Sequence, residues 1–341
     1  MADVLLSVRN LRVEIATRRG RLVAVDGVSF DIAEGEVLGV VGESGAGKSI
    51  TGTAIIGLLD PPVRLASGEI AFAGERIDSL TPEAMRGLRG RHIGAIFQDP
   101  LTSLNPLLTV GRQLVQTITA HLDVSPGEAR RRAARLLAEV GIPAPNERLN
   151  AYPHELSGGM RQRMVLALAF CCEPRLVIAD EPTTALDVSV QAQVIDLFKR
   201  MCRERGTAVM LITHDMGVIA ETADRIAVMY AGRLVEIGPA RAVLRAPVHP
   251  YTRGLMSSIP NMKRRNADLP QIDGSMPRLS DIPAGCAFHP RCPVRVARCF
   301  RERPALSAAG DTAAACWLTS AGSLAADAGR LAADHEAAGH A

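Results

Sequence analysis

Aromatic residues and long apolar runs are both scarce in this sequence. One Trp, three Tyr and seven Phe among 341 residues leave no stretch in which aromatic and basic side chains alternate, the pattern that stacks on nucleic-acid bases. The longest apolar run, Met164 to Cys172, has nine residues, whereas a helix that spans a bilayer needs roughly 20. We therefore expect neither a nucleic-acid-binding protein nor a membrane-embedded one.

A secretory signal is also missing, because the N-terminus has no basic stretch followed by an apolar segment and a small-residue cleavage site. The sequence thus predicts a cytoplasmic chain that reaches a membrane only through a partner. The rest of the composition is that of a globular protein, with 47% hydrophobic residues, 22% charged residues and a formal net charge of +3. A chain of this length has room for one large or two ordinary domains.

Apolar runs that alternate with helical patterns predict an α/β fold with a mainly parallel sheet. Residues 4–40 favour short strands in a hairpin-like, antiparallel N-terminal sheet. The pattern that follows consists of a buried strand at 36–41, a helix at 49–59, a helical stretch at 106–142, a strand at 175–180, a helix at 190–205 and a strand at 208–213. The helical stretch indicates a helical subdomain, at about residues 100–165, inserted into the first domain.

Proline is dense after about residue 245, and long regular elements are not compatible with that density. We expect three parts in the chain: a first domain at 1–250, an irregular Cys-rich region at 251–318, and a frayed or partly helical Ala-rich tail at 319–341.

A glycine-rich loop follows the first buried strand and precedes a helix. Its sequence fits GxxxxGK[ST], which turns backbone N–H groups toward phosphate oxygens, and the helix start adds partial positive charge. We expect Lys48 to bridge the β- and γ-phosphates of a nucleotide and the Ser49 hydroxyl to bind Mg²⁺. The residues expected at the nucleotide are Gly42, Glu43, Ser44, Gly45, Ala46, Gly47, Lys48, Ser49 and Ile50.

Two acids end the strand at 175–180, and polar side chains end two others. Asp180 is placed to reach the Mg²⁺ shell, and Glu181, one residue beyond, is a candidate general base for the attacking water. His214 follows the strand at 208–213, where its ring would face the γ-phosphate at the carboxyl edge of the sheet. Gln98 follows another apolar run, a position suited to sensing Mg²⁺ or water while moving with the helical insert.

The segment Leu156-Ser157-Gly158-Gly159-Met160-Arg161-Gln162-Arg163 resembles the signature of the ABC transporter ATPases. It lies just before a helix, where the Ser157 hydroxyl and the Gly158 and Gly159 amides present donors to an anion. The resemblance implies a P-loop NTPase fold that binds ATP and Mg²⁺. It also implies that two ATPase subunits pack head to tail, so that the signature of one caps the γ-phosphate held by the other.

All the motifs occur in family order across about residues 5–245. Asp187 resembles the family's D-loop, Gln98 its Q-loop and His214 its switch histidine. Two departures stand out: Met160 replaces the commoner Gln, and the aromatic that stacks on adenine is missing near Arg18–Arg21. Arg19 or a nearby aliphatic side chain is our candidate to pack on the base instead.

The C-terminal segments HPYTRGL (249–255) and GCAFHPRCP (285–293) resemble the oligopeptide/dipeptide importer ATPases, with nickel importers of the same group left open. The resemblance implies a related second ATPase subunit, two transmembrane permease subunits and an extracytoplasmic peptide-binding protein. The chain would then lie peripherally at the cytoplasmic face of the inner membrane.

Four cysteines of the Cys-rich region form a C-x5-C-x6-C-x16-C series: Cys286, Cys292, Cys299 and Cys316. Four thiolates can hold zinc or a 4Fe-4S cluster, and the long gaps fit zinc's CxxC pairs poorly. Free thiols or disulfides are the remaining reading, and the family resemblance favours the 4Fe-4S cluster. His289 is a possible substitute ligand or a surface residue. Cys171, Cys172 and Cys202 are expected on helices as small buried hydrophobes.

Two other classes of function compete with transport. A soluble ABC ATPase of translation or DNA repair would usually carry two cassettes or a long coiled coil, and this chain has one phosphate loop and no heptads. A nucleotide-binding regulator without catalysis would be favoured if Glu181 or His214 were absent. The sequence therefore favours an ATPase that energises import of peptides.

Overall fold

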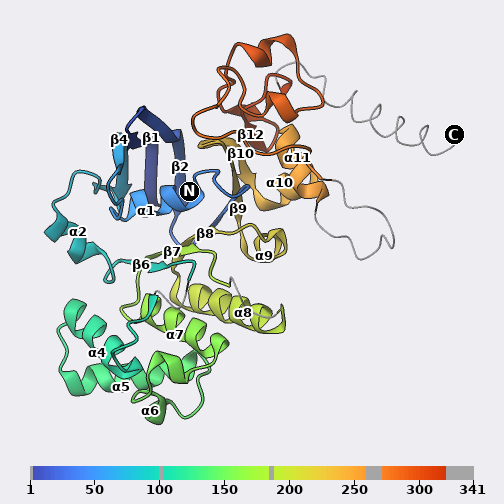
Figure 1. Ribbon diagram of the computed structural model, residues 1–341. Coiled ribbons are helices and arrows are strands. Elements are labelled where there is room, and N and C mark those ends of the chain that lie inside the picture. The colour runs from blue at the N-terminus through green and yellow to red at the C-terminus, as the bar shows by residue number, and fades with distance from the viewer. Residues whose placement is uncertain (1–2, 100–102, 184–187, 259–270, 320–341) are drawn as a thin grey trace, which may run out of the picture.

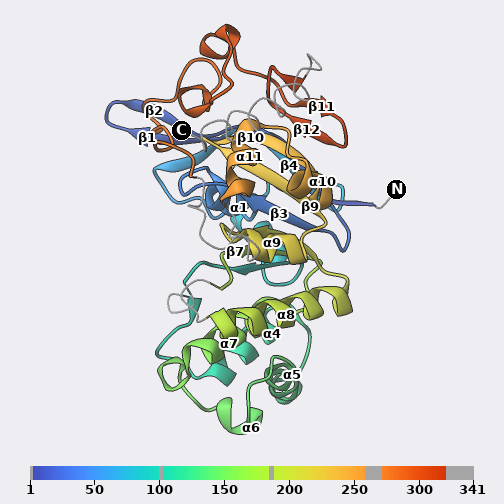
Figure 2. The same cartoon turned by 90° about the vertical axis from the view of Figure 1, so that its right-hand side faces the viewer.

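The computed structural model describes residues 3–99, 103–183, 188–258 and 271–319, which form two sheets and a set of helices (Figures 1 and 2). The strands are β1 (Val4–Thr17), β2 (Gly20–Ala33), β3 (Val37–Val41), β4 (Val63–Phe72), β5 (Glu75–Arg76), β6 (Ile93–Ile96), β7 (Leu176–Asp180), β8 (Ala208–Ile212), β9 (Arg225–Tyr230), β10 (Arg233–Pro239), β11 (Ser307–Ala309) and β12 (Thr312–Ala314). The α-helices are α1 (Lys48–Ile55), α2 (Pro82–Leu88), α4 (Val110–His121), α5 (Pro126–Glu139), α6 (Pro145–Arg148), α7 (Gly158–Phe170), α8 (Val188–Arg205), α9 (Met216–Thr222), α10 (Ala240–Arg245) and α11 (Pro250–Ser257). The 3-10 helices are η1 (Pro153–Glu155), η2 (His289–Arg291) and η3 (Ala297–Phe300).

The N-terminal sheet is antiparallel, as the sequence predicts, with the strand order β2-β1-β4-β5. Strands β1 and β2 have 14 residues each and are longer than the short strands that the sequence predicts. Their pairing shifts register at several positions, for example between Val8 and Leu11. Each such bulge interrupts the two-residue alternation of apolar side chains, so the sequence pattern looks like several short strands.

The larger sheet has the order β11-β12-β10-β9-β3-β8-β7-β6 among the described residues. Strands β9, β3, β8, β7 and β6 run parallel, whereas β10, β12 and β11 continue the sheet with antiparallel pairs. The side chains of β8 are all buried, as expected for a central parallel strand covered on both faces. The fold is therefore the predicted α/β architecture with a mainly parallel core.

The Cys-rich region contributes two strands to this sheet. Residues Glu236 and Ile237 of β10 pair with Ala314 and Ala313 of β12, and β11 closes a short hairpin with β12. The sequence analysis did not predict these strands, because three residues are too few to show an alternation. The C-terminal region is thus joined to the core by backbone hydrogen bonds.

Aromatic side chains also join the C-terminal region to the core. The ring of Tyr230, at the end of β9, lies 4.6 Å from that of Tyr251 in α11 and 5.3 Å from that of Phe288. All three residues are buried, and such tilted or edge-on pairs add to the stability gained by burial. Three of the eleven aromatics in the chain therefore meet at this junction.

Helices α4, α5 and α6 occupy the end of the molecule farthest from the C-terminal region, with α7 and α8 between them and the sheet (Figures 1 and 2). One face of α5 is buried, at Ala129, Ala133, Leu136 and Leu137, and the arginines of this helix are exposed or half-buried. None of the helices among the described residues is long and apolar enough to cross a membrane.

The three cysteines expected as small hydrophobes are buried, at exposures of 1% for Cys171, 0% for Cys172 and 5% for Cys202. Cys202 lies in α8 as predicted, but Cys171 caps the C-terminus of α7 and Cys172 follows in a turn, so only Cys202 lies within a helix. Burial raises the pKa of the Cys202 thiol to about 12, and a protonated thiol is unreactive. The Ala-rich tail beyond Thr319 lies outside the described residues.

Candidate functional site

The glycine-rich loop connects β3 to α1 at the carboxyl edge of the central sheet. Gly42 has φ +153°, and a Cβ there would lie 2.2 Å from the carbonyl oxygen of Met229, so only glycine fits. Gly47, at φ +100°, caps α1 without a side-chain hydrogen bond. The N–H groups of the first helical turn are therefore left for an anion.

Lys48 is the first residue of α1 and is 6% exposed. Its Nζ donates to the carbonyl oxygens of Gly42 at 2.7 Å and Glu43 at 3.0 Å, and an ammonium group has three donors, so one remains for a phosphate oxygen. Burial lowers the pKa of Lys48, and the nearby carboxylates of Glu181, Asp180 and Glu43 oppose that shift. The loop thus holds a cation between carbonyl oxygens and the acids at the end of β7.

Asp180 ends β7 beside the loop and accepts a hydrogen bond from the Ser49 side chain. Its Oδ1 atom is buried and has no hydrogen-bond partner among the described residues. Burial raises the pKa of Asp180, helped by Glu181 and opposed by Ser49 and Lys48. A buried carboxylate oxygen without a partner is costly, and a hydroxyl with a carboxylate is the oxygen donor set that Mg²⁺ prefers. These two residues therefore fit the predicted Mg²⁺ site.

Glu181 lies between Gln98 and His214. Gln98 Nε2 donates to Glu181 Oε2 at 3.0 Å, and His214 Nδ1 lies 2.9 Å from Glu181 Oε1. Glu181 has the unusual φ of +49°, and its N–H donates to the carbonyl of Ile212 at the end of β8 at 2.8 Å. The structure therefore brings together three residues that the sequence places after three separate strands.

The signature segment begins α7 on the helical side of the molecule, apart from α1 in both views (Figures 1 and 2). Ser157 is its N-cap, and the Ser157 hydroxyl accepts from the N–H of Met160 at 3.3 Å. Ser157 and Gly158 are exposed and Gly159 is half-buried, where a Cβ would approach Val190 Cγ1 to 2.9 Å. The start of α7 thus presents its N–H groups to the surface. Asp187 lies outside the described residues.

A buried glutamine connects α7 to the loop that carries Glu181. Gln162, 2% exposed, donates from Nε2 to the carbonyl oxygen of Pro182, next to Glu181. Gln162 belongs to the signature segment, but its sequence position alone indicates no role for it. Movement of α7 would therefore act directly on the backbone beside the candidate base.

The turn between β1 and β2 replaces the expected adenine-stacking aromatic with arginines. Arg21, Leu22 and Val23 line a cavity of about 790 Å³ between this hairpin, β10 and the C-terminal region. No residue of the phosphate loop lines this cavity, so the cavity does not indicate where the nucleotide binds. That Arg19 or an aliphatic neighbour packs on the base stays a prediction.

The thiols of Cys286, Cys292, Cys299 and Cys316 line one small pocket, together with His289 and Trp317. Burial raises the pKa of Cys286 and Cys316, and raises that of Cys292 to about 11. Among the described residues no three His, Cys, Asp or Glu side chains are placed to bind one metal ion. A tetrahedral zinc with bonds of about 2.3 Å would need its thiolates within about 4 Å of one another, and no such group is found among the described residues.

Two residues at the phosphate loop escaped the sequence analysis. Tyr251 Oη accepts from the N–H of Glu43 at 2.9 Å, and Arg291 Nη1 donates to both carboxylate oxygens of Glu43, at 2.9 and 3.0 Å. They lie 208 and 248 positions from Glu43 in the sequence. A local sequence pattern cannot predict a contact between positions so far apart. Tyr251 and Arg291 were noted only as members of the two C-terminal segments that resemble the importer ATPases.

Two family descriptions match the chain: "ABC transporter" over residues 25–184 and "Oligopeptide/dipeptide transporter, C-terminal region" over residues 235–299. The chain is 49% identical over 318 residues to the dipeptide transport ATP-binding protein DppD of Bacillus subtilis, which covers 93% of this chain and 95% of the relative. It is 46% identical over 303 residues to the oligopeptide transport ATP-binding protein OppD of Salmonella typhimurium, with 89% and 90% covered.

The fold resembles that of a solved ATP-binding cassette, MJ0796, in a dimeric post-hydrolysis state bound to ADP and Pi. The likeness has a TM-score of 0.63 and 27% identity, and it covers 70% of this chain and 99% of MJ0796. The chain therefore belongs to the ATP-binding proteins of the ABC transporters, in the group that carries the oligopeptide/dipeptide transporter C-terminal region.

Proposed function

We propose that this ATPase energises the import of dipeptides or oligopeptides across the cytoplasmic membrane. The observation that carries the catalytic part is the placement of Glu181 between Gln98 and His214, beside Lys48 and Asp180. The solute is argued from the relatives, which are named for dipeptide and oligopeptide transport.

In the hydrolytic step, the amides of the phosphate loop and Lys48 hold the triphosphate. Ser49, Asp180 and Gln98 would hold Mg²⁺, which supplies charge neutralisation at the phosphates when bound. Glu181 takes a proton from the attacking water, whose oxygen forms the new bond to the γ-phosphorus as the bond to ADP breaks. Hydrogen bonds from Gln98 and His214 fix the two oxygens of Glu181 in the direction of that water.

A second ATPase subunit, a related chain, would complete the site. Ser157, Gly158, Gly159 and Asp187 would face the γ-phosphate bound by that subunit, because the exposed start of α7 has donors for an anion. Two transmembrane permease subunits and an extracytoplasmic peptide-binding protein would make up the rest, with this chain peripheral at the cytoplasmic face of the inner membrane.

The helical insert, at about residues 100–165, would transmit closure of the two ATPase subunits to the permease subunits. In support, Gln98 contacts Glu181 and immediately precedes the insert, and Gln162 connects α7 to Pro182. In this proposal the chain consists of a nucleotide-binding domain at 1–250, a Cys-rich region at 251–318 and a tail at 319–341.

The four cysteines of the C-terminal pocket would hold a 4Fe-4S cluster. A cubane attaches each thiolate to a different iron, so four thiols around one pocket suit it, although they do not converge on a point. Protein purified without oxygen should contain about four irons per chain and absorb broadly near about 400 nm. Colourless protein without iron, or with one zinc per chain, would reject the cluster.

Transport is tested with the assembled complex in vesicles, in the presence of its binding protein. We expect a labelled dipeptide or oligopeptide to accumulate only with Mg-ATP on the side of the ATPase subunits, and Lys48→Ala to abolish this uptake. ATP-dependent uptake of Ni²⁺ without uptake of any peptide would replace peptides by nickel as the solute. Absence of ATP-dependent uptake in a complex that hydrolyses ATP would remove the transport role.

A further inference from the structure

The phosphate loop is anchored by the C-terminal region through one residue, Glu43. Its N–H donates to Tyr251 Oη at 2.9 Å, and its carboxylate accepts from Arg291 Nη1 at 2.9 and 3.0 Å. Its carbonyl oxygen accepts from Lys48 Nζ at 3.0 Å and from the N–H of Ala46 at 3.1 Å. Every polar group of Glu43 is therefore bonded, and two of the anchors come from outside the ATPase core.

Arg291 is held in a single orientation. Its side chain is 7% exposed, and Nε donates to the carbonyl oxygen of Asp273 at 2.8 Å. Nη2 donates to the carbonyl oxygens of Ile272 and Gly274 at 3.2 and 3.3 Å. A planar guanidinium that bonds on three sides has little freedom left, so the Nη1 donor stays directed at Glu43.

Tyr251 is equally fixed. It is fully buried, and its ring packs on those of Tyr230 and Phe288, with centroids 4.6 and 5.4 Å away. Burial raises the pKa of Tyr251 above its usual value, so the phenol stays neutral at physiological pH. Its oxygen is a permanent acceptor at a set distance from the start of the loop.

These contacts decide which amides face the nucleotide. The N–H of Glu43 is directed at Tyr251, so it is not aimed at a phosphate, and the amides that follow it turn from this fixed start. The C-terminal region also covers the loop, since Met276 Cε lies 3.0 Å from where a Cβ on Gly45 would be. An amide cradle binds anions well only if its N–H groups are already oriented before binding.

We propose that Arg291 and Tyr251 are positioning residues for nucleotide binding, which hold the phosphate loop in its binding shape through Glu43. The C-terminal region, apart from any role of its cysteines, is then a structural part of the ATP site. This inference concerns nucleotide affinity and does not depend on which solute is transported.

The test is equilibrium binding of ATP and ADP to the purified full-length chain. Arg291→Ala should raise the Kd of both nucleotides about tenfold, by about 1.4 kcal/mol, because the loop amides contact phosphates that ATP and ADP share. Arg291→Lys, which keeps the charge and loses the fork, should fall between Arg291→Ala and the wild type. Tyr251→Phe, which keeps the ring packing, should raise both Kd values about threefold.

A double-mutant cycle tests whether Arg291 acts through Glu43. Glu43→Ala alone should weaken binding as Arg291→Ala does, and the double variant should be no weaker than either single variant. If Arg291 served only to hold residues 272–274, the Kd of the double variant would rise by the product of the two single-variant factors. That outcome would overturn the proposal.

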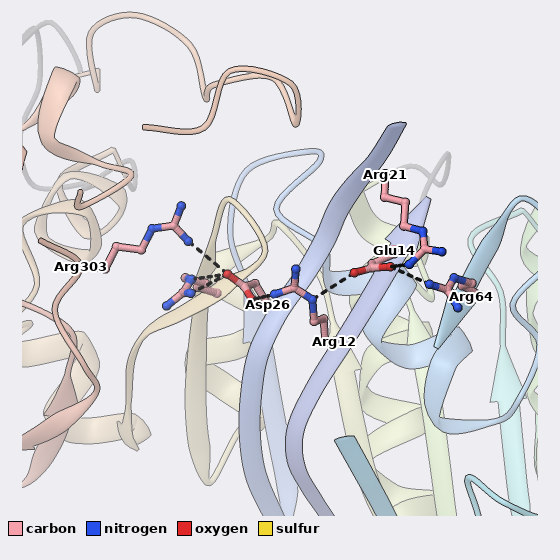
Figure 3. Close-up of polar contacts among 7 residues, drawn as sticks. Arg12, Glu14, Arg21, Asp26, Arg64 and Arg303 are labelled. Carbon is pink, nitrogen blue, oxygen red and sulfur yellow. Dashed lines mark hydrogen bonds and ion pairs between the residues drawn. The ribbon is translucent and has the colours of Figure 1, made fainter. Parts of the chain in front are cut away.

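Arg303→Ala is the matched control. Arg303 also belongs to the C-terminal region and also ties it to the core, through Asp26 of β2 at 3.2 Å and the carbonyl oxygen of Ala284 at 3.0 Å, as Figure 3 shows for Asp26. It does not contact the phosphate loop, so its loss should leave the Kd of ATP within twofold of the wild type.

An equal loss of affinity in Arg303→Ala and Arg291→Ala would attribute the effect to general loosening and overturn the proposal. Unfolding temperatures recorded for every variant identify any that fail to fold. If Arg291→Ala is among them, Tyr251→Phe decides, and wild-type Kd values in folded Tyr251→Phe protein would overturn the proposal.

Discussion

Individual residues of the ATP site act through geometry that their neighbours impose. Lys48 has two of its three donors on loop carbonyls, and the strained backbone of Glu181, at φ +49°, directs its carboxylate between Gln98 and His214. A non-glycine residue in this conformation is costly, and such residues cluster at functional sites. Glu181 therefore combines a strained backbone with the candidate role of general base.

Replacing Lys48 by Ala should abolish ATP binding and turnover. The change removes the positive charge that faces the phosphates in a buried setting, where such an interaction contributes several kcal/mol. ATP binding by calorimetry and phosphate release measure the result. Hydrolysis within about twofold of the wild type would show that this lysine does not bind the triphosphate.

Replacing Glu181 by Gln should separate binding from hydrolysis. The amide can still hydrogen bond with Gln98 and His214 but cannot accept a proton from water, so we expect ATP to stay bound while turnover falls at least about 100-fold. The measurement is phosphate release beside ATP binding on the same sample. Undiminished turnover would take the role of base away from Glu181.

The residues of the site differ in how far the sequence reveals them. The phosphate loop, the signature and the Asp180–Glu181 pair are short local motifs, so spacing and flanking elements were enough to find them. The contacts of Glu43 with Tyr251 and Arg291 were not predictable, because they join positions more than 200 residues apart. The same holds for Gln162, whose partner is a backbone carbonyl.

At the scale of elements, ion pairs join β1, β2, β4 and the C-terminal region into one network (Figure 3). Asp26 of β2 pairs with Arg12 of β1 at 2.7 Å and with Arg303 at 3.2 Å, and also with Arg233 of β10. Glu14 of β1 pairs with Arg64 of β4 at 2.9 Å. Asp26 therefore connects the C-terminal region, through Arg303, to β2 of the smaller sheet and, through Arg233, to β10 of the larger sheet.

The contribution of Asp26 to stability should depend on pH. Burial alone would raise the pKa of Asp26, but Arg233, Arg12 and Arg303 together hold it below its ordinary value of 3.8. A carboxyl group with a depressed pKa contributes stability above 3.8 that is lost as pH falls through the lower folded-state pKa. We expect Asp26→Asn to lower the unfolding temperature at pH 7 by on the order of 2 °C.

That difference should shrink once pH falls below 3.8, because the wild-type carboxyl is then increasingly protonated. Asp60→Asn, at an exposed loop position, is the control and should match the wild type at both pH values. A difference between Asp26→Asn and wild type that stays constant from pH 7 to well below 3.8 would show that the charge of Asp26 is not what stabilises the junction.

The elements themselves were predicted to different degrees. Strands β3, β7 and β8 were found from continuous apolar runs, because a strand buried on both faces has no polar positions. The full lengths of β1 and β2 were missed where bulges interrupt the alternation. Strands β11 and β12 were missed because they have three residues each, and because β12 pairs with β10, so that Thr312 contacts Glu236, 76 positions earlier.

At the scale of the whole molecule, the two halves of the anion-binding machinery lie on different lobes. The phosphate loop lies at the sheet edge, whereas the exposed N-terminus of α7 lies on the helical side (Figures 1 and 2). Under the proposed function, head-to-tail pairing with a second ATPase subunit would place the start of α7 of one subunit against the phosphate loop of the other. The C-terminal region, which packs on the phosphate loop, lies far from α7 in both views (Figures 1 and 2).

The most direct measurement is the mass in solution, by light scattering, of the Glu181→Gln chain mixed with its second ATPase subunit, with and without ATP. We expect ATP to bring the two subunits together and ADP not to do so. We further expect that Ser157→Arg, which fills the anion site at the start of α7, prevents this association although ATP still binds. Association that is unaffected by Ser157→Arg, or that fails with ATP bound, would contradict closure of the site by the signature segment.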